Sequence, residues 1–162
     1  MDRLWSPWRM EYIEAARDDG DGAEPCVFCA LLEPDAEQRR VLARNESAFV
    51  ALAKYPYNPG HLLVLPTRHV GEMTDVTVDE AAAVHGLLQR SVAALQEASA
   101  PQGFNLGLNL GRVAGAGIPE HLHWHLVPRW GGDTNFMPVI AGTRVLPELL
   151  DETYRKLAPH FA

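Results

Sequence analysis

The stretch HLHWHLVPRW, residues 121–130, places histidine at every second position for three steps and holds three of the chain's seven histidines. Alternate side chains of a β-strand point to opposite faces. The spacing therefore predicts a strand with His121, His123 and His125 on one face and the intervening apolar residues on the other. Because a row of buried imidazoles without partners is costly, the histidine face is expected to meet water, a metal or a ligand.

Two kinds of chemistry fit such a face. Two neighbouring histidines can chelate one metal with a third ligand from elsewhere. In the second interpretation, one histidine attacks phosphorus while its neighbours position the phosphate and the leaving group. The preceding loop GRVAGAGIP favours the second, because Gly111, Gly115 and Gly117 allow backbone N–H groups to approach an anion closely.

Composition limits the kind of protein. The chain has 162 residues, of which 47% are hydrophobic, and no composition shift divides it, so one domain over 1–162 is expected. A net charge of −7 disfavours a broad surface for nucleic acid and favours a small partner. We expect a cytoplasmic protein without membrane contact, because no apolar run resembles a signal peptide or a membrane span.

The remaining patterns predict antiparallel strands and one main helix, an α+β arrangement. Thr77 and Glu80 form a capping box before apolar residues at helical spacing, which predicts a long helix to Ser99. Loops rather than helices link the strands, so neighbouring strands are expected to be antiparallel. We expect a hairpin over 41–53, strands over 61–66, 103–111 and 121–128, and an N-terminal arm with a mobile loop over 1–24.

The only two cysteines, Cys26 and Cys29, are separated by two residues. In a reducing compartment this spacing favours a metal or redox pair over a disulfide. Two thiolates at this spacing can hold one Zn²⁺ from a tight turn, whereas no thioredoxin-like βαβ pattern surrounds the pair. Reduced, unliganded cysteines in the core are the alternative.

The motif HLHWHLV fits His-x-His-x-His-x-x with apolar residues at x, and it resembles the signature of the histidine triad family of nucleotidyl hydrolases and transferases. The resemblance also includes CVFC, NPGHLLVLPTRHV and the helix that follows, so it extends from Cys26 to Trp130. The flanks LWSPWRMEYI, YPYNPGH and PRWGGDTNF resemble the branch that contains actinobacterial diadenosine tetraphosphate phosphorylases. The resemblance implies the fold of this family, with an antiparallel sheet and one main helix, and a homodimer.

The resemblance also implies roles for particular residues. His123, the middle histidine, would attack the α-phosphorus of a bound nucleotide and form a nucleotidyl-histidine. We assign His125 to the proton that the leaving group requires, and His61 to orienting the ring of the nucleophile by a hydrogen bond. Asn109 matches a phosphate-side position, next to the loop glycines. Trp130 would either stack on a base or close the edge of the core.

Zinc-containing members of this family have further ligands at the positions of His69 and His121. Together with Cys26 and Cys29 these residues would close a tetrahedral, structural zinc site. Four protein ligands leave no open position, so we expect zinc to support the fold and not to act directly in catalysis.

The chain departs from the family at two positions. Many members carry Asp or Asn, which binds ribose, where this chain has Ala53. Members commonly have a Ser or Gln phosphate donor where this chain has Gly117, and such donors can change rates by orders of magnitude. The contact with ribose is therefore expected from residues other than Ala53. The loop over 111–119 is expected to bind the phosphates through its backbone N–H groups.

Together with the residues, the resemblance implies an enzyme that cleaves the phosphoanhydride of dinucleoside polyphosphates, a diadenosine tetraphosphate phosphorylase or hydrolase, with orthophosphate or water as the acceptor. Hydrolysis of nucleoside phosphoramidates or aminoacyl adenylates through the same intermediate is a second hypothesis. A third is a zinc-stabilised nucleotide-binding protein with weak catalysis, which Ala53 and Gly117 favour.

Overall fold

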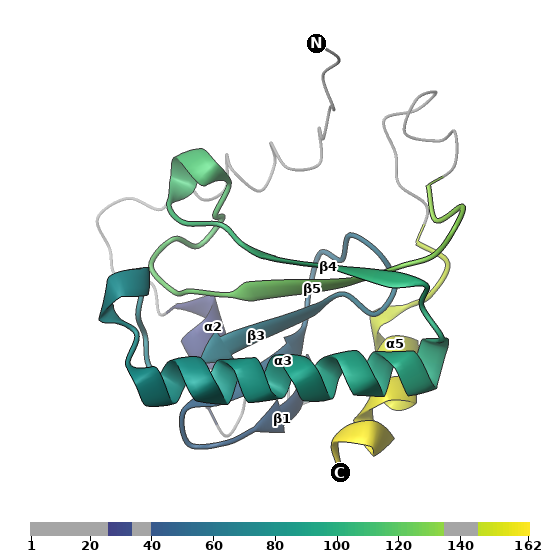
Figure 1. Ribbon diagram of the computed structural model, residues 1–162, viewed down its shortest axis with the longest axis horizontal. Helices are drawn as coiled ribbons and strands as arrows, with labels where there is room; N and C mark the ends of the chain where they lie inside the picture. Colours follow the sequence, from purple (N-terminus) through teal and green to yellow (C-terminus); the bar gives the residue numbers. More distant parts are fainter. Residues whose placement is uncertain (1–25, 34–39, 135–145) are drawn as a thin grey trace.

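The computed structural model describes residues 26–33, 40–134 and 146–162 (Figure 1). At its centre lies a five-stranded sheet in the order β1-β2-β3-β5-β4, with every neighbouring pair antiparallel. The strands are β1 (Val41–Arg44), β2 (Ala48–Leu52), β3 (Leu62–Pro66), β4 (Gly103–Leu108) and β5 (Trp124–Arg129). The helices are α2 (Val27–Ala30), α3 (Val78–Ser99) and α5 (Leu150–Leu157), with short 3-10 turns η2 (Met73–Asp75), η3 (Arg112–Ala114) and η4 (Ala158–Phe161). The predicted α+β fold is confirmed.

Helix α3 starts at the predicted capping box. The Thr77 hydroxyl accepts from the main-chain N–H of Glu80 at 3.2 Å, and the Glu80 carboxylate accepts from the N–H of Thr77 at 2.9 Å. These two bonds satisfy N–H groups that the first turn of a helix leaves without partners. The helix then runs along one face of the sheet, as Figure 1 shows.

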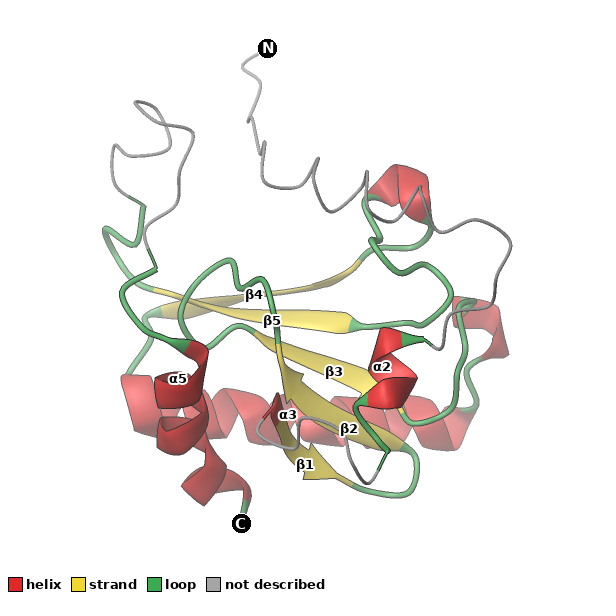
Figure 2. Ribbon diagram, turned by 180° about the vertical axis from the view of Figure 1, so that it is seen from behind, coloured by secondary structure: helices red, strands yellow, loops and turns green. Residues whose placement is uncertain are grey.

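Side chains pack against both faces of the sheet. The cluster on the α3 side includes residues of β2, β3 and β5 together with Leu157 and Phe161 from the C-terminal segment. A second cluster on the opposite face, where α2 lies (Figure 2), brings Phe28 against Phe49 and Leu63. All residues of β2 and β3 are buried, because both of their faces are covered.

The pairing of β3 with β5 places the histidines. Trp124 and Leu126 belong to the α3 side of the sheet, so His125, which lies opposite Leu63, faces the other side. The strand predicted over 121–128 begins only at Trp124, since the N–H of Leu122 donates to the carbonyl of Val70 outside the sheet. The alternation of the triad persists through this short loop.

Two expectations depend on parts of the chain that are not described. The predicted arm over 1–24 lies outside the described residues, and the single domain over 1–162 stays a prediction for the same reason. Within the described ranges, no helix has both the length and the apolar character needed to span a membrane.

Candidate active site

His123 has one nitrogen engaged with the main chain. The residue is 6% exposed, and its Nδ1 lies 2.8 Å from the main-chain oxygen of His121. A carbonyl oxygen only accepts, so Nδ1 carries the proton and the lone pair of the neutral ring is on Nε2. Burial lowers the pKa of His123, which keeps the ring neutral near pH 7. A neutral, oriented imidazole is suited to nucleophilic attack.

His61 lies against His125. Its Nε2 is 3.0 Å from Nδ1 of His125, and its Nδ1 accepts from the main-chain N–H of Tyr57 at 3.1 Å. The hydrogen bond expected between His61 and the ring of His123 is thus made to His125. The strand register explains this difference, because Leu63 lies opposite His125 and His61 precedes Leu63 by two residues on the same face.

Aromatic contacts complete the surroundings of the triad. The ring of Phe28 lies 5.0 Å from that of His123 and 5.6 Å from that of His121. The ring centroids of His123 and His125 are 5.1 Å apart, and the rings meet edge to face at an interplanar angle of 67°. Phe28 was not among the predicted site residues, and the only signal for it in the sequence is its position between Cys26 and Cys29.

Cys26, Cys29, His69 and His121 form a cluster that can hold a metal ion, with all four ligand atoms within 4.8 Å of one another. The Nδ1 atom of His121 lies 3.5 Å from the sulfur of Cys26 and 3.6 Å from that of Cys29. Nδ1 of His69 lies 3.4 Å from the sulfur of Cys29. A tetrahedral zinc site has sulfur-to-nitrogen edges of about 3.6 Å, from bond lengths of about 2.3 and 2.0–2.1 Å. The donor set and its spacing therefore fit this ion.

The protonation states of the cluster also suit metal binding. Nε2 of His121 donates to the main-chain oxygen of Pro66 at 2.9 Å, which leaves Nδ1 deprotonated toward the cysteines. Burial lowers the pKa of His121, so this ring is neutral. Burial, reinforced by Cys26, raises the pKa of Cys29 to about 11, so a metal that binds its thiolate displaces a proton.

A close backbone approach brings His69 to this cluster. A Cβ at Gly71 would lie 2.8 Å from the main-chain oxygen of Pro119, a separation that real Cβ atoms do not adopt. Glycine therefore lets the segment after β3 pass directly beside the segment that carries His121. The rings of His69 and His121 lie 5.3 Å apart as a result.

The glycine-rich loop forms a compact turn around η3. Gly111 and Gly115, with φ of 76° and 97°, adopt backbone conformations that favour glycine. The main-chain N–H of Gly115 donates to the main-chain oxygen of Arg112 at 2.9 Å. The side-chain amide of Asn109 donates to the main-chain oxygen of Gly115 at 3.3 Å. Asn109 and the N–H of Gly115 thus stabilise the loop from within. Gly117 is half-buried at the loop's end, just before Ile118, which packs against the second core cluster.

Trp130 is half-buried, and Ala53 is buried. The indole N–H of Trp130 donates to the oxygen of Ser99 at 3.2 Å, which places the ring at the end of α3 and favours the core-edge alternative. Ala53 is 4% exposed within the second core cluster.

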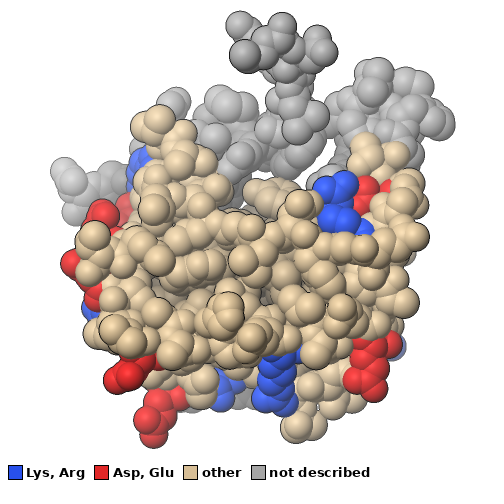
Figure 3. Space-filling view, viewed as in Figure 1, with Lys and Arg blue, Asp and Glu red and all other residues tan. Residues whose placement is uncertain are grey.

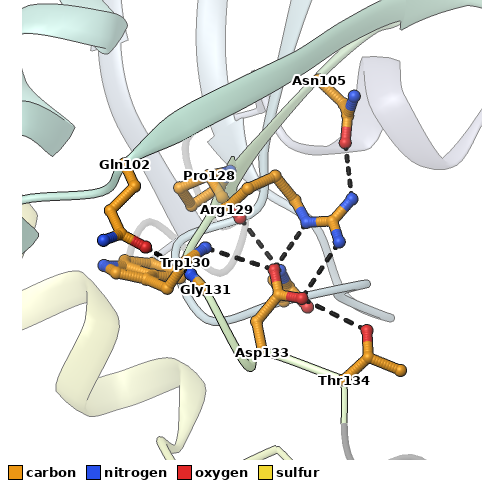
Figure 4. Close-up of polar contacts among 9 residues, drawn as sticks. Gln102, Asn105, Pro128, Arg129, Trp130, Gly131, Asp133 and Thr134 are labelled. Carbon is orange, nitrogen blue, oxygen red and sulfur yellow. Dashed lines mark hydrogen bonds and ion pairs between the residues drawn. The ribbon is translucent and has the colours of Figure 1, made fainter.

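A polar network fastens the segment before His61 to the end of β5. Asn58, which is 3% exposed, donates to the oxygen of Pro128 at 2.9 Å and to the carboxylate of Asp133 at 2.8 Å. Figure 4 shows that carboxylate between the guanidinium of Arg129 and the main chain of Trp130. The Arg129 guanidinium holds the pKa of Asp133 well below its usual range. Asn58 and Asp133 lie 75 residues apart, so no local sequence pattern indicates this contact.

Comparisons with known proteins agree with this geometry. The HIT domain family matches residues 35–132. A protein of Mycobacterium tuberculosis named AP-4-A phosphorylase is 44% identical over 166 residues, covering 100% of this chain and 85% of that protein.

Two similar solved structures are also of proteins described as histidine triad proteins. A zinc-bound histidine triad family protein from Mycobacterium smegmatis has a TM-score of 0.69 and 30% identity, covering 86% of this chain and 95% of that one. A hypothetical histidine triad nucleotide-binding protein from Sulfolobus tokodaii has a TM-score of 0.64 and 26% identity, covering 84% of this chain and 89% of that one. The chain belongs to the histidine triad, or HIT, family.

Proposed function

We propose that this protein is an enzyme that cleaves the phosphoanhydride of dinucleoside polyphosphates, with orthophosphate as the acceptor. The observation that carries the proposal is the full-length similarity to the mycobacterial protein named AP-4-A phosphorylase, at 44% identity. The position of His123 supports it, since a buried neutral ring with Nδ1 bonded to a carbonyl presents Nε2 as the attacking atom.

The reaction proceeds in two displacements. Nε2 of His123 forms a bond to the α-phosphorus, and the bond from that phosphorus to the leaving nucleoside polyphosphate breaks. An oxygen of orthophosphate then attacks the nucleotidyl-histidine, the phosphorus–nitrogen bond breaks, and a nucleoside diphosphate leaves. Diadenosine tetraphosphate gives ATP in the first displacement and ADP in the second.

Other residues support these steps. His125 assists the leaving group and is held by His61, whose Nε2 is 3.0 Å from it. Asn109, Gly115 and Gly117 shape the loop beside the phosphates. Trp130 is assigned to the edge of the core, because its indole is bonded to the end of α3.

The metal of the Cys26, Cys29, His69 and His121 cluster is proposed to be zinc. Thiolate and imidazole ligands in tetrahedral spacing suit this ion, and the similar Mycobacterium smegmatis protein is described as zinc-bound. Zinc bound there supplies a structural cross-link between α2, the segment after β3 and the start of the triad. A cytoplasmic location, where thiols stay reduced, suits these ligands.

A homodimer is proposed through the outer surface of β4 and α3. Strand β4 is at the edge of the sheet, and Leu106 on it is 55% exposed. Between β4 and α3 lies a groove of about 300 Å³, lined by His85, Leu88, Gln89, Val92 and Leu106. Figure 3 shows that this face is mostly uncharged, with charged residues along its margins. An apolar edge strand is a surface that a second copy can pair with. Leu106→Glu is expected to yield monomers in analytical ultracentrifugation.

The decisive experiment supplies diadenosine tetraphosphate with and without orthophosphate and separates the products by anion-exchange chromatography. We expect ATP with ADP, in amounts that depend on orthophosphate. ATP with AMP would instead indicate water as the acceptor. Binding of the nucleotide without turnover under either condition would contradict the enzymatic proposal and favour a nucleotide-binding protein.

A further inference from the structure

The ring of Tyr57 stacks on two imidazoles at one end of the triad. The ring of Tyr57 lies 4.8 Å from that of His61 at an interplanar angle of 24°, and 5.8 Å from that of His125 at 23°. The rings of His61 and His125 are 5.2 Å apart. The aromatic face of Tyr57 therefore covers both imidazoles.

The hydrogen bonds among these residues have a fixed direction. The main-chain N–H of Tyr57 can only donate, so Nδ1 of His61 accepts and the proton of the neutral ring is on Nε2. That Nε2–H then donates to Nδ1 of His125, 3.0 Å away. In the neutral ring of His125 the proton is consequently on Nε2.

The segment that carries Tyr57 is attached to the strand that carries His125. Asn58, the next residue, is buried and bonded to Pro128, which lies on β5. The N–H of His61 also donates to the oxygen of Asn58 at 3.1 Å. The position of Tyr57 relative to His125 is therefore held by direct bonds to the same strand.

We propose that Tyr57 is a positioning residue for His125. Its main-chain N–H sets the tautomer of His61 and through it that of His125, and its ring packs over both imidazoles and excludes water from the bond between them. His125 then presents Nε2–H as a hydrogen-bond donor to the leaving-group oxygen. This inference rests on the proposed function only for the identity of that leaving group.

The first test needs no substrate. Long-range proton–nitrogen NMR correlations of histidine-labelled protein at pH 8 distinguish the two neutral tautomers. We expect His125 protonated at Nε2 in the wild type and also in Tyr57→Leu, which keeps the main-chain N–H, but the proton between His61 and His125 should exchange with water faster in that variant, where the ring no longer covers the hydrogen bond. A wild-type His125 protonated at Nδ1, or equally fast exchange of that proton in the wild type and in Tyr57→Leu, overturns the inference even if the protein cleaves dinucleoside polyphosphates.

The second test is kinetic. Tyr57→Leu is expected to lower kcat for diadenosine tetraphosphate about tenfold or more, with little change in KM. Tyr57→Phe keeps the aromatic ring and is expected to have the kcat of the wild type. Tyr55→Leu is the matched control, because Tyr55 is 63% exposed in the same loop.

In a His125→Ala background, Tyr57→Leu is expected to have no additional effect, since it acts through the missing ring. An equal loss in both backgrounds would indicate a general structural effect and contradict the inference. Absence of wild-type turnover would contradict the proposed function, and the NMR result would then decide the inference by itself.

Discussion

The Nδ1 atom of His123 lies 2.8 Å from the main-chain oxygen of His121, whose own imidazole lies 3.5 Å from the sulfur of Cys26. One short segment thus connects the proposed nucleophile with the proposed metal site. Displacement of His121 moves the atom that orients His123, so the two sites are mechanically coupled although no ligand is shared.

The first prediction concerns the nucleophile. His123→Ala is expected to abolish turnover with the fold intact, whereas His125→Ala slows the reaction less severely because it only assists the leaving group. Rapid quenching with α-labelled nucleotide is expected to leave acid-labile label on the wild type and none on His123→Ala. His160→Ala, in η4, is the control histidine and should keep full activity. Near-normal turnover by His123→Ala would show that the triad is only a binding surface.

The second prediction concerns the metal. Purified protein is expected to contain about one equivalent of zinc, and Cys29→Ser to contain much less and to unfold at a lower temperature. Chelator should lower the Tm of the wild type but change that of Cys29→Ser little, because that variant has already lost the ion. Wild-type protein that has met no chelator and contains no zinc would contradict the assignment.

The third prediction compares two glycines. Gly71→Ala would place a Cβ 2.8 Å from the oxygen of Pro119, so the segments that carry His69 and His121 must separate. We expect a loss of stability of about 2 kcal/mol and weaker metal retention. Gly86→Ala is the matched control, since nothing lies within 4 Å of its Cβ position in α3 and the change should stabilise the helix by about 0.5–1 kcal/mol. Urea unfolding of both variants measures the difference, and equal effects would contradict the steric argument.

The fourth prediction concerns acid stability. Hydrogen bonds from Arg68 and Thr77 lower the pKa of Glu80 to about 2 from an ordinary value of 4.5. Because the folded state holds its proton less tightly than the unfolded state, Glu80 contributes stability above pH 4.5 that is lost as the pH falls toward 2. Glu80→Gln is expected to cost about 1–2 kcal/mol at pH 7 and progressively less as the pH falls below 4.5. Urea unfolding of the wild type and Glu80→Gln at pH 7, 5 and 3 tests this prediction. A difference in unfolding free energy between the two proteins that does not change with pH would contradict it.

The sequence predicted the elements because their signals are local. The capping box of Thr77 and Glu80 marks the start of α3, and the alternation around His123 separates the two faces of the sheet. The four candidate metal ligands were expected through the family resemblance, and the structure brings them together.

The contacts that were not predicted depend on tertiary packing. His61 meets His125 because of the register between β3 and β5, which no local pattern specifies. Tyr57 stacks on both rings from a loop that Asn58 connects to Pro128, 70 residues away in the chain. Trp130 turns toward Ser99, which depends on where α3 ends relative to β5.

Strand β5 lies between neighbours of very different exposure. On one side is β3, buried on both faces, and on the other is β4, which forms an edge of the sheet and has several exposed residues. Local opening in proteins begins where backbone hydrogen bonds are exposed. Amide hydrogens between β4 and β5 should therefore exchange with solvent faster than those between β3 and β5. Any partner that covers the β4 edge would slow this exchange and reduce the fluctuations of the strand that carries His125.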